Sequence, residues 1–142
     1  MSELRKNFVD ECGMIEEVMK SAVNSNTEIC AIGLVMEEAL NGQYIIKDYS
    51  NIQELEGAVN ERCVFIPSKI SYSLIRTSIR TGLYPIIMHS HVIGYENSEP
   101  LRFSNQDILF METFSKLARH EGVFKSFFAL TNGKEWIIEE KQ

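Results

Sequence analysis

The sequence predicts an α/β domain with a central mixed β-sheet flanked by helices. Apolar residues recur at helical spacing in three segments, and short apolar runs of strand length lie between those segments. Two dipeptides, Asn41-Gly42 and Asn132-Gly133, are typical of tight turns between paired strands. A chain of 142 residues suits one core, so we expect a single domain over residues 1–142.

The first half of the chain predicts one helix followed by strands. From about Glu3 to Val23, apolar residues recur every three or four positions, which indicates an amphipathic helix. Residues 28–36 form an apolar run of strand length. The turn at Asn41-Gly42 then leads into alternating residues 44–48, which predicts a hairpin. Residues 63–66 have the character of a further strand.

The second half predicts two more helices and three strands. Pro67-Ser68 is typical of a helix start, and this helix is expected to close near Gly82. Residues 85–89 read as a buried strand, residues 104–121 as a helix, and residues 124–131 and 135–139 as a closing hairpin around Trp136. The expected order is therefore α-β-β-β-α-β-α-β-β.

Composition limits the classes of function. Apolar residues make up 44% of the chain and charged residues 24%, values typical of a globular protein. The formal net charge of -6 argues against nucleic-acid binding and against docking on an anionic membrane. Three dispersed cysteines without a CxxC pair indicate free thiols in a reducing compartment. With neither a signal peptide nor a membrane span in the sequence, we expect a cytoplasmic protein.

The first candidate for chemistry is a pair of histidines at the end of a predicted strand. Residues i and i+2 of a strand project from the same face, so His89 and His91 offer two imidazoles to one metal, while Ser90 points the other way. Two ordinary histidines near a surface turn are the alternative, and an HxH pattern alone does not decide between them.

Two further segments carry carboxylates with two interpretations each. Ser104 and Asp107 open a helix and share one of its faces, so they form either a capping box or part of a ligand set. The two roles are compatible, since a ligand in the first turn of a helix is held rigidly. Glu28, directly before an apolar strand, is either an exposed charge at the strand end or a group directed at a site.

The combination of these segments resembles the signature of the JAMM metalloproteases, also called the MPN+ or JAB family. That signature consists of an upstream Glu, an HSH or HTH at a strand end, and a downstream SxxD, matched here by Glu28, His89-Ser90-His91 and Ser104-x-x-Asp107. EICAIGL resembles the family's Glu-x-x-Gly-Leu-Leu type segment, and FIPS and PIIMHSH match its strand-helix-strand run. The resemblance covers most of the chain and implies the JAMM/MPN fold, which is similar to that of cytidine deaminases.

The resemblance also implies a role for each residue. His89, His91 and Asp107 would ligate Zn2+, with water as the fourth ligand, and three protein ligands with an open position are typical of catalytic zinc. Such a zinc lowers the pKa of its water toward roughly 7. Glu28 would take the proton and pass it to the leaving amine, and Ser104 would stabilise the oxyanion.

The substrate expected from the resemblance is the amide bond after the C-terminal tail of a ubiquitin-like modifier, in a protein encoded beside activating and conjugating enzymes. Two alternatives stay open: a non-catalytic scaffold or binding module, and a hydrolase that releases a small amino-acid group from a carrier-protein tail. The chain departs from the family pattern in having Val92 and Phe103 where proline is usual, and in a lengthened loop over residues 92–103. This loop puts substrate and access in question rather than metal ligation.

Overall fold

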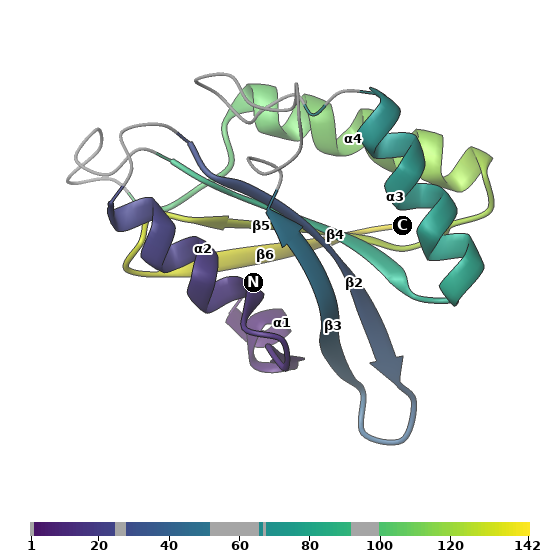
Figure 1. Cartoon of the computed structure of the whole chain (residues 1–142), viewed down its shortest axis with the longest axis horizontal. Coiled ribbons are helices and arrows are strands. Elements are labelled where there is room, and N and C mark those ends of the chain that lie inside the picture. The colour runs from purple at the N-terminus through teal and green to yellow at the C-terminus, as the bar shows by residue number, and fades with distance from the viewer. Residues whose placement is uncertain (1, 25–27, 52–65, 67, 92–99) are drawn as a thin grey trace.

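The computed structural model describes residues 2–24, 28–51, 66, 68–91 and 100–142. In these residues, helices lie on both faces of a curled six-stranded sheet with strand order β1-β3-β2-β4-β5-β6 (Figure 1). The elements in chain order are α1 (Ser2–Lys6), β1 (Phe8–Val9), α2 (Met14–Val23), β2 (Cys30–Glu38), β3 (Gln43–Asn51), α3 (Ser68–Thr81), β4 (Tyr84–Ser90), α4 (Asn105–His120), β5 (Ser126–Thr131) and β6 (Trp136–Lys141).

The sheet is mixed, as predicted. Strand β2 runs antiparallel to both β3 and β4, and β5 runs antiparallel to β6. Strands β4 and β5 are parallel, so the chain must cross over between them, and α4 makes that crossover. In such a crossover, the chain leaves the C-terminal end of β4 and enters the N-terminal end of α4. These two ends can therefore lie close together at one edge of the sheet.

The alternating side chains of β4 divide the core into two layers. Ile87 packs among residues of α3 and α4 on one face of the sheet. Ile86 and Met88 pack with residues of α2 on the other face. In Figure 1, α3 and α4 accordingly lie on one side of the sheet, and α1 and α2 lie on the opposite side. Since residues two apart share a face, His89 falls on the side of α3 and α4.

The single helix expected from Glu3 to Val23 is wrong, because α1 and α2 are separated by the short strand β1. Phe8 pairs with Tyr44 of β3, and the two rings stack with centroids 5.2 Å apart. Gly13, at φ 81°, then reverses the chain into α2. This long-range strand pairing overrides the helical periodicity at Phe8, and the periodicity persists only in α2, where Ile15 and Val18 are buried.

The other elements are confirmed within a few residues of their expected bounds. Helices α3 and α4, strands β2 and β4, and both hairpins occupy the predicted segments. The strand expected at residues 63–66 lies outside the described residues except for Ile66, and residues 92–99 of the lengthened loop lie outside them as well. None of the helices in the described ranges is long and apolar enough to cross a membrane.

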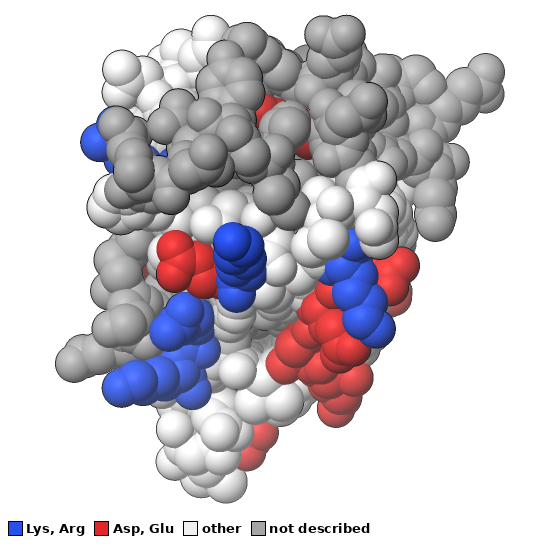
Figure 2. Space-filling model, turned by 90° about the vertical axis from the view of Figure 1, so that its left-hand side faces the viewer, with Lys and Arg blue, Asp and Glu red and all other residues white. Residues whose placement is uncertain are grey.

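Charged side chains of both signs are present on the face of the molecule shown in Figure 2. Among the described residues in this view, Asp and Glu gather mainly toward one side, whereas Lys and Arg occur on both sides.

Candidate metal centre

Strand β4 brings His89 and His91 to the face covered by α4. Ser90, between them, projects to the other face of the sheet. His91 lies just beyond the last residue of β4, but its backbone N–H donates to the carbonyl of Thr131 in β5 at 3.0 Å. Both imidazoles are therefore carried on backbone that is hydrogen-bonded into the sheet.

The start of α4 positions Asp107. Ser104 is the N-cap residue, and its hydroxyl oxygen accepts from the backbone N–H of Asp107 at 3.0 Å. In return, Oδ2 of Asp107 accepts from the backbone N–H of Ser104 at 2.8 Å. This capping box confirms the sequence-based interpretation of the Ser104-x-x-Asp107 segment as a helix cap. It also holds the Asp107 carboxylate, which is only 2% exposed, in one orientation.

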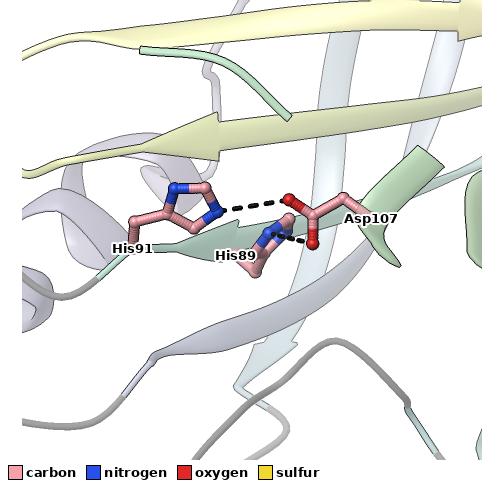
Figure 3. A group of neighbouring side chains, drawn as sticks. All are labelled: His89, His91 and Asp107. Atoms are coloured by element: carbon pink, nitrogen blue, oxygen red, sulfur yellow. Dashed lines mark hydrogen bonds and ion pairs between the residues drawn. The ribbon is translucent and has the colours of Figure 1, made fainter. Parts of the chain in front are cut away.

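The three side chains meet at the end of β4 (Figure 3). His89 Nε2 lies 3.1 Å from Asp107 Oδ1, and His91 Nε2 lies 3.2 Å from Asp107 Oδ2. One ligand atom from each residue lies within 4.8 Å of the others. Two nitrogen or oxygen ligands at ordinary zinc distances around a tetrahedral ion would be roughly 3.3 Å apart. The spacing of the three groups is therefore close to that of ligands around one metal ion.

Two atoms of this cluster are buried without a hydrogen bond. His89 Nε2 and Asp107 Oδ1 lie 3.1 Å apart as an ion pair, but neither atom has a regular hydrogen bond among the described residues. Leaving such atoms unpaired in the protein interior is costly. A cation between them would satisfy both lone pairs, so His89, His91 and Asp107 can hold a metal ion.

The electrostatics of the cluster favour an ionised carboxylate. Burial alone would raise the pKa of Asp107, but the imidazoles of His89 and His91 and the backbone N–H of Ser104 outweigh it and hold that pKa well below its ordinary value. Asp107 is therefore negatively charged at neutral pH and is ready to bind a cation without first losing a proton.

The cluster has an apolar inner wall and an open side. A small pocket beside His89 and Asp107 is lined by apolar side chains, namely Ile87, Phe103, Phe110, Met111 and Phe128. The side chain of His91 is 32% exposed, whereas those of His89 and Asp107 are 10% and 1% exposed. His91 is therefore the most exposed member of the cluster, and the apolar wall would strengthen the electrostatic interactions of the other two.

Strand pairing indicates where Glu28 lies relative to the histidines. Cys30 pairs with His89 in the antiparallel β2–β4 ladder, and Ile29 is hydrogen-bonded to Ser90. Continuation of this register by one residue would put Glu28 opposite His91. Opposite residues in an antiparallel pair project from the same face. Glu28 is half-buried and, by this register, its side chain starts on the metal side of the sheet.

Three residues near the cluster were not singled out as site residues by the sequence. Phe103, which is 9% exposed, lies with its ring centroid 6.3 Å from that of His89. Thr131 holds the backbone of His91, and Ser90 holds the start of β2. Their contacts join segments far apart in the chain, so the local sequence did not predict these supporting roles. Among the predicted residues, the structure thus brings His89, His91 and Asp107 into one cluster and places Ser104 as the cap of α4 beside it. Glu28 lies two residues before Cys30, which pairs with His89.

A scan against models of known protein families finds no match, and a search of curated proteins finds no significant relative. The argument for function therefore depends on the site itself and on its motifs.

Proposed function

We propose that this protein is a zinc-dependent peptidase or isopeptidase of the JAMM/MPN type. Its substrate would be the amide bond that follows the C-terminal tail of a ubiquitin-like modifier. The observation that carries the proposal is a pair of buried ligand atoms, His89 Nε2 and Asp107 Oδ1, which lie 3.1 Å apart without a regular hydrogen bond, beside the more exposed imidazole of His91.

The donor set suits zinc. Two imidazole nitrogens and one carboxylate oxygen, without a thiolate, are a common ligand set for catalytic zinc, and three protein ligands leave a position open. When bound, zinc would supply a Lewis acid that makes water nucleophilic near neutral pH and polarises the substrate carbonyl. His89, His91 and Asp107 would hold the ion, with Asp107 fixed from behind by the Ser104 backbone N–H.

Glu28 and Ser104 would perform the remaining chemistry. The Glu28 carboxylate, two residues before the Cys30–His89 pair, would accept the proton of the attacking water and deliver it to the leaving amine. The Ser104 oxygen accepts from the Asp107 N–H, which leaves its own O–H proton free to donate. That proton can stabilise the negative charge that develops on the carbonyl oxygen during amide hydrolysis.

The substrate class is inferred from the resemblance of the motifs to the JAMM family. Glu28, His89-Ser90-His91 and Ser104-x-x-Asp107 supply the family's complete signature. Members of this type cut after an extended tail that ends in the scissile amide. We accordingly propose a role in deconjugation or maturation of a modifier in the cytoplasm, next to activating and conjugating enzymes.

The proposal is tested by metal analysis and by hydrolysis of matched substrates. Protein purified without added metal should contain close to stoichiometric zinc and should cleave ubiquitin-like fusions, with Glu28→Gln as the inactive, zinc-replete control. A protein that binds no zinc stoichiometrically would instead be a scaffold or binding module. Turnover confined to short peptides or aminoacylated carrier tails would identify a small-substrate hydrolase.

A further inference from the structure

Two buried hydrogen bonds link the start of β2 to the residue between the two histidines. The backbone N–H of Ile29 donates to the hydroxyl oxygen of Ser90 at 2.8 Å. The backbone N–H of Ser90 donates to the carbonyl of Ile29 at 2.9 Å. Ile29 is 3% exposed and Ser90 is 1% exposed, so both bonds are shielded from water. They join residues 61 positions apart in the chain.

The first of these bonds departs from a regular sheet. In an antiparallel hydrogen-bonded pair, two opposite residues exchange two main-chain bonds, so the Ile29 N–H would ordinarily donate to the Ser90 carbonyl. Here the Ser90 side chain takes the place of that carbonyl. One of the two bonds that attach Ile29 to Ser90 therefore depends on a hydroxyl group, and a substitution can remove it while the main-chain bond from Ser90 N–H stays.

We infer that Ser90 is a positioning residue that holds Glu28 in register opposite His91. Glu28 directly precedes Ile29, so fixing the amide of Ile29 fixes the backbone from which the carboxylate extends. The Ser90 side chain lies on the face of the sheet away from the metal cluster and contributes no ligand atom. The role of Glu28 as proton acceptor in this inference rests on the proposed function.

The expected consequence is a defect in catalysis with intact metal binding. Ser90→Ala leaves His89, His91 and Asp107 in place but leaves the Ile29 amide without its acceptor. Displacement of a catalytic group by about 1 Å can cost on the order of 100-fold in rate. We expect kcat to fall by about ten- to 100-fold with KM nearly unchanged, because proton transfer rather than substrate binding is impaired.

Hydrogen exchange tests the tether without requiring activity. In Ser90→Ala, the Ile29 amide should exchange about tenfold faster or more, since its buried partner is lost. Ser90→Thr keeps the acceptor and should restore both the protection and kcat. Ser115→Ala is the matched control: Ser115 is also buried, and its hydroxyl has no hydrogen-bond partner among the described residues. Unchanged Ile29 protection in Ser90→Ala would overturn the inference.

A double-mutant comparison of Ser90→Ala with Glu28→Gln distinguishes a role of Ser90 in positioning Glu28 from a general effect on the structure. If Ser90 acts through Glu28, Ser90→Ala should have little further effect on kcat in a Glu28→Gln background. An equal fold-loss in both backgrounds, or loss of zinc from Ser90→Ala, would overturn the inference. NMR of the Glu28 carboxyl gives a readout independent of turnover: its response to added zinc should shrink in Ser90→Ala and persist in Ser115→Ala. If wild-type protein binds zinc but hydrolyses nothing, the proposed function fails, while the exchange and NMR results still decide the positioning role.

Discussion

Substitution of Ser104 should separate the stability of α4 from the chemistry at its first turn. The Ser104 oxygen accepts from the Asp107 N–H at 3.0 Å, and Ser104 is otherwise exposed. One side chain is thus a helix cap through its lone pair and, in the proposed mechanism, a hydrogen-bond donor through its proton. Replacements differ in which of these they keep: Ala keeps neither, Gly keeps most of the cap stability, and Asp keeps the cap acceptor.

The stability effects follow from N-cap energetics. Ser104→Ala should destabilise the protein by about 1 kcal/mol, whereas Gly should cost only a few tenths and Asp should be tolerated. For a domain of this size, 1 kcal/mol corresponds to a fall in Tm of roughly 3–4 °C. Thermal melts should therefore rank Ala below wild type, with Gly and Asp close to wild type.

The rate effects should follow a different order. Removal of one oxyanion donor costs about 100- to 1,000-fold in kcat, so Ala, Gly and Asp should all be slow although their melting temperatures differ. Asp should be the slowest of the three, because it adds negative charge beside the developing oxyanion. Ser104→Thr keeps the acceptor and the donor and is the active control.

The assay combines thermal melts, zinc content and turnover of a ubiquitin-like fusion on the same preparations. Zinc content is required because an introduced Asp can itself bind the ion. A zinc-replete Ser104→Gly protein with wild-type kcat would refute the donor role and leave Ser104 as a cap alone. A Ser104→Ala protein with the same Tm as wild type would refute the prediction that the Ser104 cap stabilises the fold by about 1 kcal/mol.

Four further predictions test the site and its support. Asp107→Ala should lower zinc occupancy sharply, as measured by metal analysis, and unchanged occupancy would remove Asp107 from the ligand set. Glu28→Gln should keep fold and zinc but lose about 100- to 10,000-fold in kcat, and retention of most turnover would reduce Glu28 to a surface charge. Gly33→Ala should cost about 1–3 kcal/mol in chemical denaturation, because the added Cβ would lie 2.6 Å from the Asp48 carbonyl oxygen; a neutral effect would show that β3 yields there. Chelation should leave far-UV circular dichroism unchanged while lowering Tm, since zinc at about 100 times its Kd adds roughly 2.7 kcal/mol; loss of secondary structure would contradict a preformed site.

Local signals explain what the sequence could predict. Helices α3 and α4 follow from apolar spacing, and Ser104 and Asp107 mark the start of α4 through a capping box that the structure confirms. The alternation of β4 puts His89 and His91 on one face without reference to any other segment. These features depend on residues a few positions apart in one helix or strand. At that range, separation along the chain determines which side chains share a face.

Long-range pairing explains what the sequence could not predict. Strand β1 interrupts the expected first helix because Phe8 stacks on Tyr44, 36 positions away by residue number. The position of Glu28 depends on the β2–β4 register, in which Cys30 faces His89. The packing of Phe103 near His89 likewise depends on how the segment before α4 meets β4. The spacing of residues within one segment cannot predict which distant segment it will contact.

The two interpretations of Asp107, helix cap and metal ligand, are satisfied by different atoms of one carboxylate. Oδ2 accepts from the Ser104 N–H, whereas Oδ1 is the buried oxygen without a hydrogen-bond partner among the described residues. Capping therefore does not compete with ligation: it orients the free oxygen toward His89 before any ion arrives. Because the capping box and the β4–β5 ladder hold the ligands independently of metal, the site is preorganised. Zinc binding would then require little reordering of the backbone. Because the first turn of α4 is already folded, little of the binding free energy would be lost to ordering it, and the affinity for zinc would be correspondingly higher.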